Sequence, residues 1–396
     1  MCISRIQWII YLLLLAGIGF VAWMFLLHTS TVTAPSTSEV SINDRHELEL
    51  QVPLEKTVDL RKAFATEVQT HIASKKDFDL RSIYESYIDK IGANGMITEI
   101  QRMDPVCHFE GHDLGKVIFE KIGTIGESLT ICQDACYSGC MHGVFMEAFK
   151  KKQEEYLKTH PAKPGEDPED REHINMDVVK ESIPSICEDP SVSSSYRPGD
   201  CAHGVGHAVT YLANDDWKKA IETCNLFTNK KLAYYCASGA YMEYVTIKGA
   251  SDIVDPTKSL FYPCDQGEYP AACFFSKVGD AIRATQAKGG KSSDVIRACL
   301  KLPGLYQLGC FHGFGNAYIG PLQEDKLSIK DLCANGSLED RQMCIEGAMM
   351  RIGKYAYEKG QTICSTQLEG VDQKICLDAL SQRMYGLDRP FERYLN

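Results

Sequence analysis

Apolar and polar positions divide the chain into three parts. Residues 8–27 form a run of about 20 apolar residues without a charge, long enough to cross a bilayer as one helix. The next segment is rich in Ser, Thr and Pro and then acidic, as in a flexible stalk. From residue 56 onward, apolar residues recur at helical spacing. The pattern predicts a cytoplasmic tip and transmembrane signal anchor in residues 1–28, a stalk in 29–55, and a helical domain in 56–396.

The charges around the apolar run predict its orientation. Arg5 precedes the run and no Lys or Arg follows until Arg45, so we expect a cytoplasmic N-terminus and an extracytoplasmic body. A cleaved signal peptide is the alternative, but the run is long for one, and the small-residue site near Ala34 is followed directly by Pro35. We favour a single-pass membrane protein whose body is periplasmic, extracellular or lumenal.

A short motif recurs along the predicted helical domain. Its clearest copy runs from Cys201 to His207, with Cys at position zero, His at plus two, Gly at plus three and His at plus six. Further copies begin at Cys140, Cys236, Cys273, Cys310, Cys344 and Cys376. A shifted copy spans residues 108–112, where we align His108 with His203 and the preceding cysteine comes one place late.

The spacing of the motif predicts the fold. The plus-two positions are 108, 142, 203, 238, 275, 312, 346 and 378, so most copies lie about 35 residues apart. This is the length of a helix–turn–helix repeat. One interval is longer because it holds a charged insertion, residues 150–172, which we expect to be a surface loop. The sequence therefore predicts an all-α fold of about eight helix hairpins, stacked as a solenoid or a closed α/α toroid.

One unit illustrates the predicted hairpin. Its first helix covers residues 217–224, its turn covers 225–231, and its second helix runs from about 234 towards 245. Glycine inside a helix costs about 1 kcal/mol relative to alanine. Its recurrence at plus three predicts a close approach between helix backbones at Gly143, Gly204, Gly239, Gly313 and Gly347.

The cysteines indicate a disulfide framework. Of 17 cysteines, 16 lie beyond the apolar run, and most units carry one cysteine 8 to 14 residues before the motif cysteine. Free buried thiols in a cytosolic protein are the alternative, which fits the regular spacing and the anchor poorly. Each short closed loop is expected to contribute about 2–3 kcal/mol. The predicted pairs are Cys107–Cys136, Cys132–Cys140, Cys187–Cys201, Cys224–Cys236, Cys264–Cys273, Cys299–Cys310, Cys333–Cys344 and Cys364–Cys376.

Histidines gather at the plus-two and plus-six positions, which share one helix face. Imidazole is a common metal ligand, and two histidines four residues apart on a helix can bind one ion. Because packed helices lie about 8–10 Å apart, ligands from neighbouring units can converge. His312 comes three units later and can join only if the array closes into a ring. The candidate ligands are His108, His112, His142, His203, His207 and His312.

Disulfide-bonded cysteines leave only nitrogen and oxygen ligands, which suit zinc, iron or copper. Buried polar packing is the alternative role for these histidines. Glu110, Glu147 and Glu243 lie beside the stripe and are candidate general bases or ligands, or helix-supporting carboxylates. The sequence carries no His-Glu-x-x-His protease signature, no Cys-x-x-Cys-His haem motif and no serine elbow.

Two functions from different classes follow. The net charge of −11 and the absence of a basic stripe argue against nucleic-acid binding. The first hypothesis is a transition-metal site on the inner face, serving metal binding or a metal-dependent hydrolase or oxidase. The second is a non-catalytic scaffold that binds a protein or glycan on its concave face. The sequence leaves open whether the protein is an enzyme.

Overall fold

The computed structural model describes residues 54–74, 79–104, 107–132, 135–160, 177–193, 197–382 and 384–387. This part of the chain is helical and contains no strand, as the sequence predicts. The predicted anchor and residues 29–53 of the predicted stalk lie outside the described residues, whereas the last two stalk residues, 54 and 55, begin a helix. Within the described ranges, no helix has both the length and the apolar character that a membrane crossing requires.

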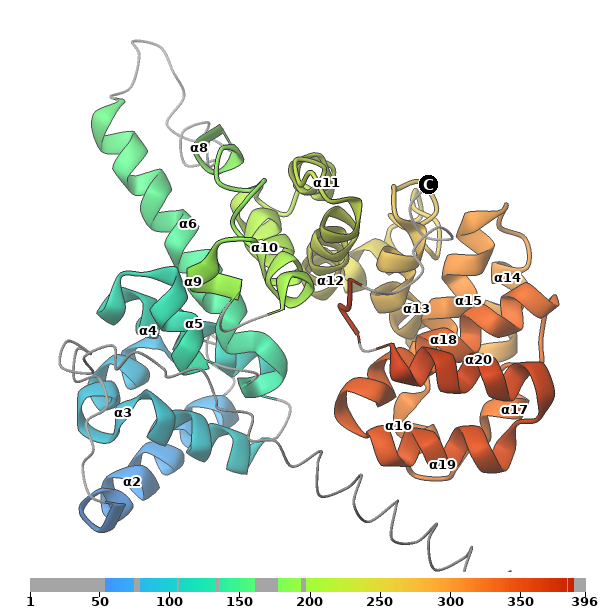
Figure 1. Ribbon diagram of the computed structural model, residues 1–396, viewed down its shortest axis with the longest axis horizontal. Helices are drawn as coiled ribbons and strands as arrows, with labels where there is room; N and C mark the ends of the chain where they lie inside the picture. Colours follow the sequence, from blue (N-terminus) through green and yellow to red (C-terminus); the bar gives the residue numbers. More distant parts are fainter. Residues whose placement is uncertain are drawn as a thin grey trace, which may run out of the picture. The chain divides into compact units, whose positions relative to one another are not determined.

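Figure 1 shows the helices in chain order. Their bounds are α2 Leu54–Ala73, α3 Arg81–Met103, α4 His108–Ile122, α5 Ile125–Cys132, η2 Ala135–Ser138, α6 Gly139–Thr159, α8 Asp177–Lys180, α9 Pro190–Ser193, α10 Pro198–Leu212, α11 Trp217–Cys224, α12 Lys230–Val254, α13 Pro270–Ala287, α14 Ser292–Cys299, α15 Leu305–Ala317, α16 Ile319–Gln323, α17 Ile329–Leu332, α18 Leu338–Tyr355, α19 Tyr357–Gln367 and α20 Gly370–Ser381.

The unit containing α11 and α12 has the predicted hairpin form. The first helix, α11, has the predicted bounds, and it begins where Asp216 accepts hydrogen bonds from the backbone N–H groups of residues 218 and 219. The second helix, α12, is longer at both ends than the motif predicted. Asn229 caps its start by accepting from the N–H of Lys231, so the helix begins four residues earlier than expected.

The charged insertion is partly helical, which corrects the prediction of a loop over residues 150–172. Helix α6 continues through Thr159, and Gln153 is buried on it. The segment is rich in Lys, Glu and Gln, which favour helix, and Lys150 lies 3.9 Å from Glu154 one turn later. Residues 161–172 lie outside the described residues.

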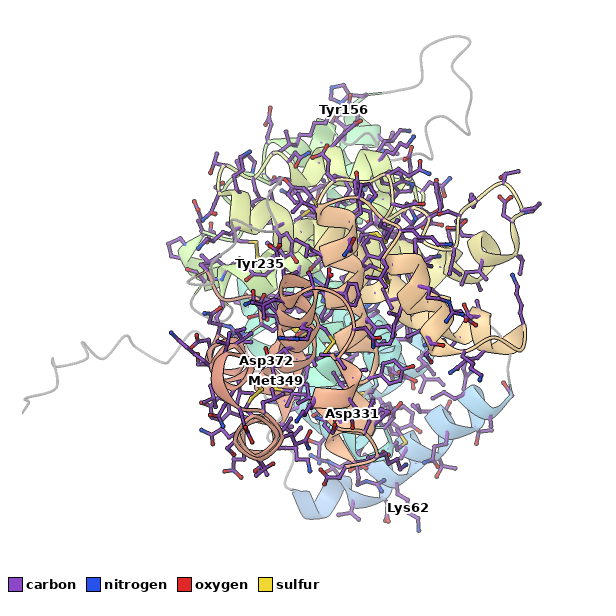
Figure 2. The ribbon with its side chains drawn as sticks, turned by 90° about the vertical axis from the view of Figure 1, so that its right-hand side faces the viewer. Lys62, Tyr156, Tyr235, Asp331, Met349 and Asp372 are labelled. Atoms are coloured by element: carbon purple, nitrogen blue, oxygen red, sulfur yellow. A yellow bond between two sulfur atoms is a disulfide. The ribbon has the colours of Figure 1, made fainter. Side chains whose placement is uncertain are left out.

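Eight disulfides form, in the eight pairs that the cysteine spacing predicts. In the unit above, the bond joins Cys224 at the end of α11 to Cys236 on α12. A methionine packs beside the Cys364–Cys376 bond: Sδ of Met349, labelled in Figure 2, lies 3.7 Å from Sγ of Cys364. Such a framework fits an oxidising environment outside the cytoplasm.

In three pairs of helices, a glycine on each helix lies against a backbone carbonyl of the other. The pairs are α4 with α6, α10 with α12, and α15 with α18. In the second pair, a Cβ on Gly206 would collide with the carbonyl oxygen of Cys236, and one on Gly239 with that of His203. The other two pairs repeat this arrangement. The glycine–carbonyl contacts there are Gly115 to Cys140, Gly143 to His112, Gly315 to Cys344, and Gly347 to His312.

The close approach predicted for the recurring glycines is therefore confirmed at Gly143, Gly239 and Gly347. It also holds at Gly313, whose Cβ would meet the carbonyl oxygen of Phe274 on α13. Gly204 differs, because the atoms nearest to its Cβ position belong to the side chains of residues 141 and 145 on α6 rather than to a backbone.

These contacts correct the alignment of the first motif copy. Gly115, Gly206 and Gly315 each face the carbonyl of a motif cysteine on the partner helix. Each of them lies three residues after a histidine, namely residues 112, 203 and 312. The structure therefore aligns His112 with His203, one helical turn later than the alignment that started from His108.

Candidate metal centre

Four histidines from three helices gather in one place. His108 and His112 lie in the first turns of α4, His142 lies on α6, and His207 lies on α10. One ring nitrogen from each lies within 4.8 Å of the others, so the group could hold a metal ion. Helix α6 packs against both α4 and α10, which brings the three helices together at this point. His108 is half-buried and the other three are buried.

Distances between the rings are compatible with one ion. Nδ1 of His142 lies 3.4 Å from Nε2 of His112. Two nitrogens bound at tetrahedral angles to a metal about 2.0–2.1 Å away would be separated by about 3.3 Å. The His108 ring lies 4.9 Å from that of His142. The rings of His142 and His207 stack with centroids 4.0 Å apart, so one of them has to turn before both in-plane lone pairs can point at one ion. Nε2 of His142 has no hydrogen-bond partner within the described residues.

Glu243 on α12 orients one of these imidazoles. Its Oε2 lies 2.7 Å from Nδ1 of His207, and both side chains are buried. A carboxylate only accepts hydrogen bonds, so the proton of His207 is on Nδ1 and the lone pair is on Nε2. A carboxylate that holds the far nitrogen of a ligand histidine is a common second partner at metal sites, where it fixes the ring and raises its basicity.

Burial keeps the imidazoles of the fully buried histidines neutral. It lowers the pKa of His112, His142 and His203 well below the ordinary value, and repulsion from neighbouring histidines acts in the same direction. Burial lowers the pKa of His207 to about 3. It raises the pKa of Glu243, an effect opposed by the positive charge that His112 and His108 would carry. Neutral imidazoles have free lone pairs, so an ion need not displace protons near neutral pH.

Two of the six candidate ligands, His203 and His312, are not among the four histidines of this group. His203 borders it: its Nε2 lies 3.2 Å from Nε2 of His207, while its Nδ1 lies 2.8 Å from Oγ of Ser238. His312 on α15 is buried, and its ring packs 5.5 Å from that of Phe275 on α13. The structure thus brings together four of the predicted ligands, and His203 as a ligand stays a prediction.

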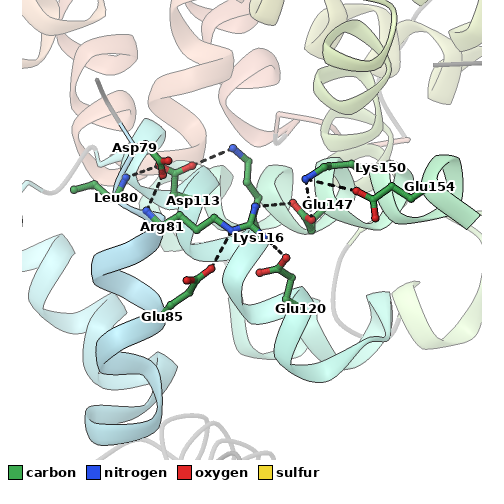
Figure 3. Close-up of polar contacts among 10 residues, drawn as sticks. All are labelled: Asp79, Leu80, Arg81, Glu85, Asp113, Lys116, Glu120, Glu147, Lys150 and Glu154. Atoms are coloured by element: carbon green, nitrogen blue, oxygen red, sulfur yellow. Dashed lines mark hydrogen bonds and ion pairs between the residues drawn. The ribbon is translucent and has the colours of Figure 1, made fainter. Parts of the chain in front are cut away.

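Glu147, a candidate base, belongs to an ion-pair network that ties α3 to α4 and α6. Arg81 lies 3.5 Å from Glu147 and also pairs with Glu85 and Glu120 (Figure 3). Lys150 lies 3.6 Å from the other oxygen of Glu147. These cations occupy both carboxylate oxygens, which gives Glu147 a role in helix packing.

Glu110, the third candidate base, points to a different cavity. It lines a space of about 280 Å³ between α2, α3 and α4, beside Asp104. Burial raises the pKa of Glu110, and the charge of Asp104 acts in the same direction. Of the three carboxylates, only Glu243 contacts a member of the histidine group.

The C-terminal segment contacts His203 beside the centre, and no pattern in the sequence indicates this. The ring of Tyr385 lies 4.5 Å from that of His203. Oη of Tyr235 on α12 donates to the carbonyl of Gly386 at 2.6 Å, and Nζ of Lys231 donates to that of Leu387. A contact between residues so distant in sequence leaves no local signal, so sequence reasoning could not find it.

The chain matches no protein family model, no curated protein and no solved structure. The described part of the chain is helical and rich in disulfides, and four of its histidines are close enough to hold a metal ion.

Proposed function

We propose that the protein is a membrane-anchored, extracytoplasmic metalloprotein that binds one transition-metal ion through His108, His112, His142 and His207. The observation that carries this proposal is the gathering of four ring nitrogens within 4.8 Å. Three of the four imidazoles are buried, which is unfavourable unless their nitrogens find partners, and an ion at the centre supplies one partner to all four.

The chemistry of the ligands limits the choice of ion. All 16 described cysteines form disulfides, so no thiolate is available among them. Neutral imidazole suits zinc, iron and copper. A bound ion of this kind would supply Lewis acidity or redox activity, which is the basis for proposing a hydrolase or oxidase. The half-buried His108 is the ligand through which the centre is most accessible.

The fold and location of the proposed metalloprotein rest on recurring features. The same glycine contact in three helix pairs, and the short cysteine spacing in successive units, support a tandem array of helix hairpins. The apolar run of residues 8–27 supports the anchor. The eight disulfides support an extracytoplasmic body.

Elemental analysis tests the proposal. The full chain would be produced through an oxidising compartment, purified, and dialysed without a chelator, and its absorption spectrum would be recorded. We expect about one equivalent of zinc, iron or copper, as one four-ligand site implies. The His112→Ala/His207→Ala variant should lose it, while His160→Ala, at the exposed end of α6, should retain it. A folded wild-type protein without metal and unable to take it up would refute the proposal.

A non-catalytic scaffold is the second candidate, and one observation favours it. The plus-six positions Met242, Gly279 and Asn316 line one groove of about 890 Å³, so the motif face of these helices borders an open space. If no metal binds, the histidines pack the helices together, and this face would bind a protein or a glycan.

A further inference from the structure

A groove of about 890 Å³ runs along α12, α13, α15 and α18. Phe109 of α4 and Met242 of α12 line it, and each is next in sequence to a residue of the histidine centre or its carboxylate partner. The Phe109 ring lies 5.7 Å from that of His108. The groove therefore extends to the edge of the histidine centre, and its volume lies in the range of small-molecule sites.

The motif explains why the space is open here. Phe275 stands at a plus-two position and Gly279 at the plus-six position of the same helix, where other units carry histidines. Gly279 has no side chain, and a Cβ there would contact only the side chain of Arg283. Helix α13 thus presents an aromatic residue and a glycine where other units carry candidate ligands.

The charges of the groove oppose those of the whole protein. The chain carries a net charge of −11, yet the groove is lined by Arg283, Lys288 and Arg351 and by a single acid, Asp280. Asp280 pairs with Arg283. Neither Lys288 nor Arg351 has an ion-pair partner in the part of the chain that the structure describes. Two cations without acidic partners, over an apolar wall, favour an anionic ligand.

The walls also offer apolar surface and one hydrogen-bond acceptor. Phe109 is 48% exposed and Val254 is 75% exposed, so large apolar side chains in the groove face solvent. Asn316 donates through Nδ2 to the carbonyl of Phe275 at 2.7 Å. Its buried Oδ1 has no hydrogen-bond partner within the described residues, so it can accept from an N–H or O–H of a ligand.

We propose that this groove binds a small organic anion with an apolar body and an N–H or O–H group. Lys288 and Arg351 attract the anion, Phe109 and Val254 contact the apolar body, and Asn316 accepts the hydrogen bond. The site does not depend on the proposed metal, because none of these side chains belongs to the histidine group.

Calorimetric titration with two matched probes tests this site on the full chain. N-octanoylglycine is anionic with an eight-carbon acyl chain and an amide N–H, and N-octanoylglycinamide differs by its neutral carboxamide end. We expect the anion to bind about tenfold or more tightly than the neutral probe. Lys288→Gln/Arg351→Gln should remove this preference and leave the binding of the neutral probe unchanged. Lys301→Gln, at an exposed position outside the groove, should change neither.

Equal affinity for the two probes, no binding of either, or an unchanged preference in the double variant would overturn the proposal. Lys288 is exposed at the end of α13, so Lys288→Gln alone provides the comparison if the double variant does not fold. Each titration is repeated after chelation. Anion binding that persists without metal separates this site from the proposed metal centre, so either proposal can fail alone.

Discussion

Glu243 determines which nitrogen of His207 faces the other imidazoles, because its carboxylate holds the Nδ1 proton at 2.7 Å. Replacing Glu243 with Gln keeps the shape but removes the charge that favours this orientation. If a metal binds here, we expect the variant to bind it about 10- to 100-fold more weakly. Competition with a chelator of known affinity measures the change.

The matched control is Glu147→Gln, which changes a buried carboxylate of the same size that pairs with Arg81 and Lys150. This variant should bind metal as the wild type does. Equal affinities of the Glu243 variant and the wild type would show that the carboxylate does not support the centre.

Lys277 on α13 is fully buried, and its Nζ has no hydrogen-bond partner within the described residues. Burial lowers the pKa of this amine. Replacement by Met keeps the length of the side chain and removes the unsatisfied polar group. We expect Lys277→Met to raise the free energy of unfolding by about 1–3 kcal/mol, measured by urea unfolding. A loss of stability would mean that the amine has a favourable partner in solution.

At the scale of elements, glycine controls how closely helices pack. A Cβ on Gly347 of α18 would collide with the carbonyl oxygen of His312 on α15. We expect Gly347→Ala to force these helices apart and to cost about 1–3 kcal/mol of unfolding free energy. Thermal and urea unfolding give the change.

Gly279 on α13 is the control, since a Cβ there would meet only the end of the Arg283 side chain at an ordinary contact distance. Gly279→Ala should stabilise the protein by about 0.5–1 kcal/mol, because alanine loses less conformational freedom in a helix. If both variants changed stability alike, the close contact at Gly347 would not be what requires glycine there.

Local elements were predictable because their signals are local. The disulfide pairs follow from cysteines a few residues apart, and the bounds of α11 follow from its cap and spacing. The alignment of the first motif copy was not predictable. His108 and His112 lie one turn apart on the same face, and Gly111 and Gly115 are also one turn apart, so both alignments fit the sequence. They are distinguished by the contacts of Gly115 with the carbonyl of Cys140 and of Gly143 with the carbonyl of His112.

At the scale of the whole molecule, the candidate site was predictable only in part. A shared helix face indicates which histidines point the same way, but not where neighbouring helices bring them. His112 and His142 meet because α4 and α6 are in glycine contact. His312 shares the motif, yet it packs against Phe275, because its place depends on how the helices are arranged over many residues.

Acid should destabilise the metal-free protein through these histidines. The unfolded imidazoles have an ordinary pKa of 6.5, whereas burial lowers the pKa of His207 to about 3 and also lowers those of His112, His142 and His203. Between these values the unfolded chain therefore binds more protons than the folded chain. The stability that the neutral histidines contribute is fully present above pH 6.5 and is lost as the pH falls towards 3. The raised pKa of Glu243 acts in the opposite direction and offsets part of the loss.

Urea unfolding of chelator-treated protein from about pH 7 to about pH 4 measures this dependence. The His142→Gln/His207→Gln variant lacks two of the buried imidazoles and should show a shallower loss. Equal slopes for the two proteins would place the acid sensitivity elsewhere.

Most of the disulfides join cysteines that are close in sequence, so the position of a backbone cut decides whether the fragments stay linked. Apart from Cys107–Cys136, every bond joins cysteines 8 to 14 residues apart. A protease cut inside one of these loops leaves the two fragments covalently linked. A cut between loops leaves them joined by helix packing alone, so denaturant without any reductant would release them. Each disulfide thus keeps its own hairpin joined after a cut, while the continuity of the molecule depends on the intact backbone between hairpins.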